Sequence, residues 1–212
     1  MEQIASLEMQ DISVKCKPTM RNFVSWTDQL QHFSCRFHSG KVYGIVGQPT
    51  KGGWALSYLL SGNCKKFQGE ILINDRLVER NLLYTNGWYV GEGLKGGLFK
   101  RQLTVREQLE RGTSVDYTVD ELVDSFELSP SRLDREIRYI SNERWNASAA
   151  IGLAHGKQVF CFPWLDDEWK NLIRGRLAHC SDVLRRSNRI ILIPVLNLSI
   201  VEDFIDEAVY LS

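Results

Sequence analysis

Two glycines at the end of an apolar run, Gly47 and Gly52 in "GIVGQPTKGGW", have the spacing of a phosphate-binding loop. Such a loop binds an anion because successive backbone N–H groups converge on it at a helix N-terminus. The full pattern, G-x-x-x-x-G-K-[ST], adds a lysine for the β and γ phosphates and a hydroxyl for magnesium. Here Gly53 stands at the lysine position and Trp54 at the hydroxyl position, while Lys51 comes two residues too early. The segment is therefore either a nucleotide site, intact or disabled, or a tight turn between a strand and a helix.

No second cluster of residues has the spacing of a catalytic or metal site. The five cysteines are odd in number and far apart, and no pair has C-x-x-C spacing. A disulfide framework or a zinc site is therefore not expected, and a reducing compartment is the simpler interpretation. The four histidines also lack ligand spacing, so we expect them on the surface or in the core and expect no metal site.

Length and charge limit the size of the core and the kinds of partner that we expect. A chain of 212 residues can bury one substantial core. The 26 basic and 26 acidic residues balance, so neither nucleic acid nor an anionic membrane is expected as the main partner. The N-terminal segment lacks the apolar run of a signal peptide, and the longest apolar run, "IILIPVL", is too short to span a bilayer. We expect a cytoplasmic protein without direct membrane insertion, which reaches the inner face of the cell membrane through a partner.

The pattern of apolar residues predicts one α/β domain over residues 1–212. Residues 1–40 are β-rich and alternate between apolar and polar side chains, and "KVYGIVG" has the continuous apolar pattern of a buried parallel strand. A helix is predicted from about Gly53 to Gly62, followed by "GEILINDRLV", a strand pair with an Asn-Asp turn. The first part of the chain therefore combines an N-terminal antiparallel β subdomain with the strand and helix that flank the glycine loop.

From about residue 100 to residue 156, the apolar residues recur with the spacing of an α-helix. Thr104 with Glu107 and Thr118 with Glu121 form two capping boxes, and Ser141 is expected to cap a third helix. The last third returns to buried strands that alternate with helices, the longest running over residues 166–186. This order predicts a mostly parallel sheet covered by helices, with an inserted helical subdomain.

The order of these segments resembles the ATP-binding subunit of ABC transporters. "FHSGKVYGIVG" and "GEILINDRLV" are similar to the family's strand into the phosphate loop and to its G-E-I-x-I-x-G strand pair. "WYVGEG" resembles the Q-loop segment, and "LTVREQL" matches L-T-V-R-E-x-L closely. Residues 128–162 resemble the run from the signature helix into the second phosphate-site strand, and residues 190–212 the switch strand and closing elements. The resemblance covers nearly the whole chain and implies a P-loop NTPase-like fold.

The departures from the family pattern fall on the residues that carry its chemistry. The strand "VFCF" ends in Pro163 and Trp164, where the family has an Asp for magnesium and a Glu that polarises water. Glu92 replaces the Q-loop glutamine and brings negative charge toward the phosphates. The switch histidine falls at Val195 or Leu196. The groups that cancel phosphate charge are therefore replaced by apolar or acidic residues.

The signature L-S-G-G-E corresponds to a segment with one residue fewer, in which Ser141, Asn142 and Glu143 follow an isoleucine.

Phosphoryl transfer depends on positioning and on cancelling charge with Mg²⁺ and a lysine, and losing one such group often costs ~10²–10³ in rate. We therefore expect no catalytic residue, no hydrolysis and no bound cofactor, with weak ATP binding as the alternative.

Three functions follow from this resemblance. The first is a non-hydrolysing subunit that docks on a membrane-embedded transporter subunit through residues 88–101 and pairs with a second ABC ATPase-like subunit, or with its own copy. The second is a weak ATPase in which Lys51, Glu92 and Asp166 or Asp167 act in improvised roles. The third is a soluble regulatory module that uses the same fold only for binding.

Several residues have two interpretations at this stage. Asp166, Asp167 and Glu168 are expected in the first turn of a helix, where anions suit the dipole. Trp145 and Trp164 suit either a dry interface or the core. The family's adenine-stacking aromatic corresponds to Phe23 or Trp26, which are equally good core residues.

Overall fold

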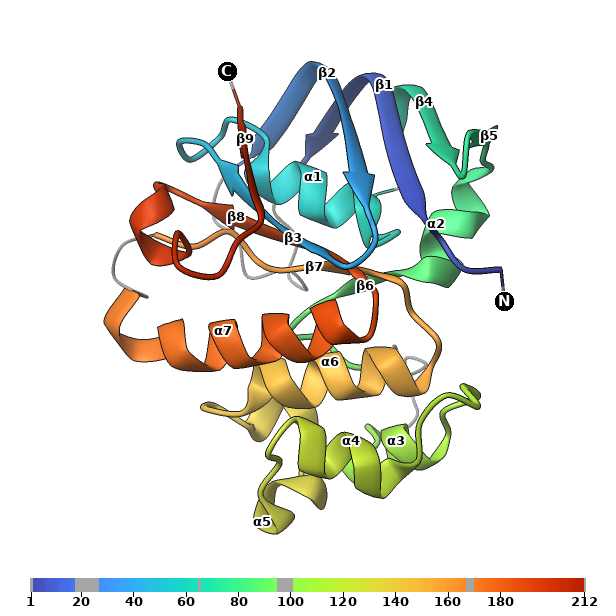
Figure 1. The fold of residues 1–212 in the computed structure, drawn as a ribbon, viewed down its shortest axis with the longest axis vertical. Coiled ribbons are helices and arrows are strands. Elements are labelled where there is room, and N and C mark those ends of the chain that lie inside the picture. Colours follow the sequence, from blue (N-terminus) through green and yellow to red (C-terminus); the bar gives the residue numbers. More distant parts are fainter. Residues whose placement is uncertain (1, 18–26, 65, 95–100, 167–169, 212) are drawn as a thin grey trace.

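The computed structural model describes residues 2–17, 27–64, 66–94, 101–166 and 170–211. Its strands form two sheets that lie on either side of helix α1 (Gly53–Leu60), as Figure 1 shows. The remaining large helices cover the far face of the second sheet (Figure 1). The mixed α/β architecture predicted from the sequence is confirmed.

The first sheet is antiparallel, with strand order β2-β1-β4-β5. Asn74 and Asp75, which join β4 to β5, both have positive φ angles, 51° and 61°. Asparagine and aspartate tolerate this left-handed conformation better than most residues, so the predicted Asn-Asp turn is confirmed. The strands of this sheet are β1 (Ser6–Cys16), β2 (Asp28–His38), β4 (Phe67–Ile73) and β5 (Arg76–Leu77).

The second sheet is parallel, with strand order β6-β7-β8-β3-β9. Its central strands are continuous apolar runs because both of their faces are covered, and every residue of β8 is buried. This arrangement confirms the predicted strand before the glycine loop. The strands of this sheet are β3 (Lys41–Val46), β6 (Gly87–Tyr89), β7 (Val159–Cys161), β8 (Ile190–Val195) and β9 (Glu207–Tyr210).

Helix α1 lies in a core formed by both sheets. Leu56, Leu59 and Leu60 are fully buried there, together with apolar residues of β1, β3 and β7. A second core lies on the other face of the parallel sheet. It joins the sheet to the helical segment, which runs from α3 (Val105–Glu110) to α6 (Arg144–Ala154). The glycine loop therefore lies at the N-terminal end of a helix that is buried on nearly all sides.

The helical segment packs below the parallel sheet in the view of Figure 1. Both predicted capping boxes are present, at Thr104 with Glu107 and at Thr118 with Glu121. Helix α6 contacts α3 and α7, and α7 in turn contacts β3 and β8. These helices therefore link the helical segment to the parallel sheet. The helices are α2 (Arg80–Asn86), α3 (Val105–Glu110), α4 (Val119–Ser125), α5 (Pro130–Leu133), η1 (Ile137–Tyr139), α6 (Arg144–Ala154), α7 (Lys170–Arg186) and η3 (Leu198–Ile200).

One predicted helix start is wrong. Helix α6 has Glu143 at its N-cap, not Ser141, and no side chain caps it. The reason is a longer-range contact: the Glu143 carboxylate accepts hydrogen bonds from the Ser129 backbone N–H at 2.9 Å and hydroxyl at 2.6 Å. At the start of α7, Asp166 is not helical, and Asp167 and Glu168, which were expected in the same first turn, lie outside the described residues.

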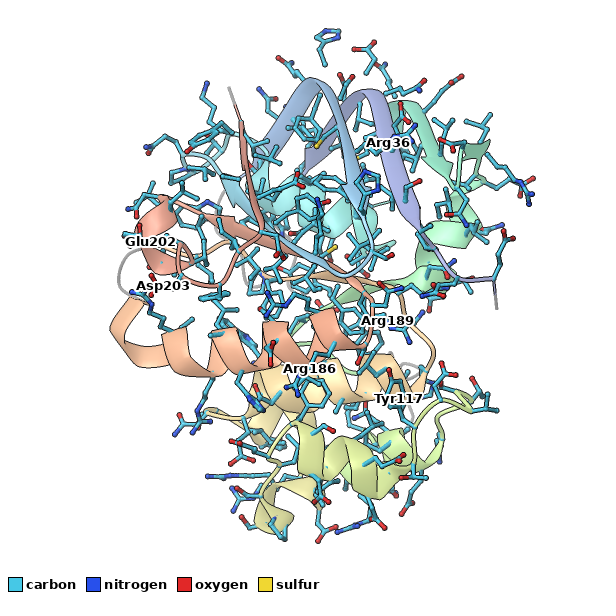
Figure 2. All side chains as sticks on the ribbon, in the orientation of Figure 1. Arg36, Tyr117, Arg186, Arg189, Glu202 and Asp203 are labelled. Carbon is cyan, nitrogen blue, oxygen red and sulfur yellow. The ribbon has the colours of Figure 1, made fainter. Side chains whose placement is uncertain are left out.

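The arginines at the end of α7 form local contacts. Arg185 and Arg186 lie in its last turn, where positive charge suits the helix dipole, and both form ion pairs with Asp182. Arg189, which is labelled in Figure 2, follows in the turn to β8. Its exposed fraction is only 7%. Near the other end of α7, Arg174 forms an ion pair with Asp203. No helix among the described residues is long and apolar enough to cross a membrane.

Candidate functional site

The glycine loop leaves β3 and enters α1 through residues in left-handed conformations. Thr50 has a φ of 72° and Gly52 a φ of 98°. Gly52 is the N-cap of α1, and a Cβ atom at this position would lie only 2.7 Å from Leu30 Cδ1. Glycine is therefore required here both by the backbone conformation and by the close approach of β2.

The helix N-terminus that this loop exposes is already bound by a carboxylate from β2. Asp28 Oδ1 accepts a hydrogen bond from the Gly52 backbone N–H at 2.8 Å, and Oδ2 accepts one from the Ala55 N–H at 2.8 Å. Asp28 is only 1% exposed and pairs with Cys16 across the antiparallel sheet. An anion of the chain itself thus lies where phosphate-binding loops bind an external anion.

Sequence reasoning missed Asp28, because nothing local marks it. It is a single aspartate at the start of a strand, 24 positions before Gly52. The only available signal was a charged residue at a strand position that faces the core. Strand alternation alone does not say that the loop of α1 lies against that position.

The Trp54 indole fills the space between α1 and the end of β6. It is 1% exposed, and its ring centroid lies 5.3 Å from that of Tyr58, which in turn lies 5.6 Å from Tyr89. Burial, followed by the negative charge of Glu92, raises the pKa of the Tyr89 phenol, so this ring stays neutral. The position of the magnesium hydroxyl in the loop pattern is therefore part of an aromatic core.

Trp164 covers the other side of the loop. Its indole Nε1 donates a hydrogen bond to the carbonyl oxygen of Gly47 at 3.2 Å. A Cβ atom on Gly53 would lie 3.0 Å from Trp164 Cδ1 and 3.2 Å from Pro194 Cβ. The lysine position of the loop is thus closed by two side chains that pack directly on it.

These contacts do not fit MgATP. Two of the amides that a phosphate would use bond Asp28, and the lysine and hydroxyl positions are filled by packing against Trp164 and by Trp54. A triphosphate would also lie beside the carboxylate of Asp28, and position 53, where the loop pattern has a lysine to cancel its charge, is a glycine. We therefore derive no chemical step through a nucleotide.

Of the other predicted site residues, Lys51 lies in the loop itself and Glu92 follows β6. Lys51 is exposed. The Glu92 backbone oxygen accepts a hydrogen bond from the Ser148 hydroxyl at 2.5 Å. Ser148 also accepts hydrogen bonds from the Gly91 N–H at 2.8 Å and from Trp88 Nε1 at 3.0 Å, so a buried hydroxyl of α6 fixes this segment.

The signature-like residues directly precede α6, which lies on the opposite side of the parallel sheet from α1 (Figure 1). Ser141 and Asn142 are exposed, and the Asn142 carbonyl accepts a hydrogen bond from Arg176. Within one chain the structure therefore does not bring them to the glycine loop.

Two further predictions fall on the end of β7 and on the switch position. Pro163 and Trp164 follow β7, as the sequence indicates, and Trp145 packs edge-on against Phe162 with ring centroids 5.7 Å apart. Val195 is the buried last residue of β8, and Leu196 donates its N–H to the Leu165 carbonyl. Phe23, Trp26, Asp167 and Glu168 lie outside the described residues.

A pocket lies at the far end of α1, near the segment predicted to dock on a partner. It is bounded by Ser61 and Asn63 after α1, by Tyr84 of α2, by Trp88 of β6, and by Lys157. Tyr84 is 57% exposed, and Leu82 on the same helix is 41% exposed. Residues 95–100 of the predicted docking segment are not among the described residues.

The described residues contain no group of three or more His, Cys, Asp or Glu that could hold a metal ion. None of the five cysteines, all of which are described, forms a disulfide. Burial raises the pKa of the Cys161 and Cys180 thiols, so both remain protonated.

Comparison with known proteins identifies solved structures that share this fold. Neither a protein-family model nor a curated protein matches the sequence. Among solved structures, the chain is similar to cbiO1 from Clostridium perfringens, part of the ABC transporter complex cbiONQ, with a TM-score of 0.66 and 14% identity over 100% of this chain and 86% of that one. It is also similar to an ATP-binding subunit of an ABC transporter, with a TM-score of 0.66 and 16% identity over 97% of this chain and 85% of that one.

A bacterial Atm1-family ABC exporter with ATP bound gives a TM-score of 0.64 and 16% identity, and the chain covers 38% of that exporter's length. Identities this low establish a fold and not an activity. The chain has the α/β P-loop NTPase-like fold of the ATP-binding subunits of ABC transporters.

Proposed function

We propose that this protein is a non-hydrolysing, ABC-type subunit that supports a transporter by docking, not by turning over ATP. The observation that carries this proposal is the contact of Trp164 with the glycine loop. The residue that stands where the fold's ATPases have carboxylates instead bonds Gly47 and packs on Gly53. Because this side chain packs on the loop from the strand end, it supports a subunit that does not hydrolyse ATP at this site.

The proposal also needs a surface for a partner. The pocket beside α2 is bordered by the exposed side chain of Tyr84, and Leu82 on the same helix is also exposed, while the loop itself is closed. Apolar and aromatic side chains of this kind are enriched at the centres of protein interfaces. A membrane-embedded subunit would bind here, and a second subunit of the same fold, with a complete G-x-x-x-x-G-K-[ST] loop, would supply the hydrolysis.

Co-purification from detergent-solubilised membranes tests the proposal. We expect the tagged chain to retain a subunit with membrane-spanning helices and a competent ATPase subunit. Leu82→Asp with Tyr84→Asp should abolish this retention, while Val115→Asp, at a residue that is 98% exposed on the helical segment, should not. Retention of a soluble partner alone, unaffected by the double variant, would instead favour the regulatory module.

The weak-ATPase alternative is tested separately. If Lys51 and Glu92 acted in improvised roles, their replacement by alanine would abolish the turnover of the isolated chain. We expect no turnover to abolish, and rapid turnover by the isolated wild-type chain would contradict the proposed function.

A further inference from the structure

We infer that Asp28 is a built-in replacement for phosphate, a permanent internal anion that organises the glycine loop and excludes an external one. This inference rests on the proposed function, because it explains how the loop keeps its shape without a nucleotide. It concerns a residue of β2, and it stands on contacts other than those of Trp164.

The loop needs an anion because its helix cannot satisfy its own first amides. The first backbone hydrogen bond within α1 runs from the Leu56 N–H to the Gly52 carbonyl, which leaves the preceding amides without partners in the helix. Gly52 at the N-cap has no side chain that could accept them. Asp28 accepts from both Gly52 and Ala55, one oxygen to each.

The charge of Asp28 is balanced by the loop. No ion pair involves Asp28 among the described residues, although its exposed fraction is only 1%. A buried carboxylate is stable only when its oxygens are hydrogen-bonded, and here the N–H groups and the positive end of the helix dipole serve that purpose. A phosphate at the same amides would have to displace the carboxylate or lie against it.

The internal anion lies on a rigid element. Asp28 begins β2 and pairs with Cys16 of β1, and the next apolar residue of the strand, Leu30, packs on Gly52. A backbone movement that carried the carboxylate away from the loop would have to separate β2 from both β1 and α1. We infer a fixed contact and not a lid that opens to admit ligand.

Amide hydrogen exchange on the wild-type chain tests the contact without any variant. With no ligand present, the Gly52 and Ala55 amides should exchange roughly 10- to 100-fold more slowly than exposed loop amides, because each is hydrogen-bonded to a charged acceptor. Exchange as fast as that of exposed loop amides would overturn the inference.

Substitution supplies the second test. Asp28→Asn keeps the shape but offers one acceptor in place of two, and should lower Tm by about 4–8 °C. Asp28→Ala leaves room for a small carboxylate, so formate should raise its Tm and restore protection at Gly52 and Ala55, whereas chloride at equal ionic strength should not. Unchanged Tm in Asp28→Asn, or no formate effect in folded Asp28→Ala, would overturn the inference.

Asp206→Ala is the matched control. Asp206 Oδ2 also accepts a backbone hydrogen bond, from Val42 at 2.8 Å, at the other end of β3. This variant should lose stability without rescue by formate, and rescue equal to that of Asp28→Ala would count against the inference. ATP turnover by a wild-type chain with protected amides would contradict the proposed function alone, while rapid amide exchange without turnover would contradict this inference alone.

Discussion

Trp164 Nε1 donates a hydrogen bond to the carbonyl oxygen of Gly47, across 3.2 Å. The contact joins Trp164, three positions after the end of strand β7, to the first glycine of the loop after β3. Parallel strands bring their carboxyl ends to one edge of a sheet, so both residues reach this edge from distant parts of the chain. Folds of this kind bind ligands at this edge, but here Trp164 packs against the loop at Gly47.

Trp54→Ala should be one of the most destabilising single substitutions in the chain. The indole is 1% exposed and packs on Tyr58, so its loss leaves a large cavity. We expect the free energy of unfolding to fall by about 3–5 kcal/mol in urea denaturation. Leu77→Ala, at a residue that is 66% exposed, should change it by less than about 0.5 kcal/mol. A loss below about 1 kcal/mol for Trp54→Ala would mean that the indole does not fill the core.

Ser148→Ala should loosen the segment that carries Glu92. The hydroxyl accepts hydrogen bonds from Trp88 and Gly91, and its removal leaves these two buried donors without a partner. We expect a loss of about 2–4 kcal/mol in the free energy of unfolding and faster amide exchange at Gly91.

Ser57→Ala is the matched control for that prediction. Ser57 is equally buried, but its hydroxyl has no hydrogen-bond partner among the described residues. Its replacement should therefore be nearly neutral, and equal losses in the two variants would contradict the assigned role of Ser148.

The Glu107 carboxyl should titrate at unusually low pH. Its hydrogen bond with Arg101, followed by that with the Thr104 backbone N–H, lowers its pKa to about 2. Because the folded pKa lies below the unfolded value of about 4.3, the stability from this group is present above pH ~4.3 and is lost as pH falls toward 2. Carboxyl NMR should give a midpoint near 2 for Glu107. A midpoint near 4.3 would show that these hydrogen bonds are absent in solution.

Local patterns predicted much of this fold. The capping box at Thr104 and the Asn74–Asp75 turn each depend on a few neighbouring residues, so the sequence was enough to place them. The cap predicted at Ser141 was wrong because a contact between Glu143 and Ser129, across 14 positions, competes with local capping.

From the sequence, the site could be predicted only as a set of positions at which the usual residues of the pattern are replaced. Gly53, Trp54 and Trp164 stand at positions of a known pattern, so sequence comparison reveals that the usual groups are absent. The group that takes the place of the anion, Asp28, belongs to another sheet and reaches the loop only through the packing of β2 on α1. Its role depends on tertiary structure, which a reading of local pattern does not supply.

Calorimetric titration of ATP into the wild-type chain, with and without Mg²⁺, tests the central claim most directly. A competent ABC-type subunit with a complete G-x-x-x-x-G-K-[ST] loop serves as the positive control under the same conditions. We predict no saturable heat and no release of phosphate from this chain, because Asp28, Trp54 and Trp164 occupy the loop. Saturable, magnesium-dependent binding accompanied by turnover would contradict the account.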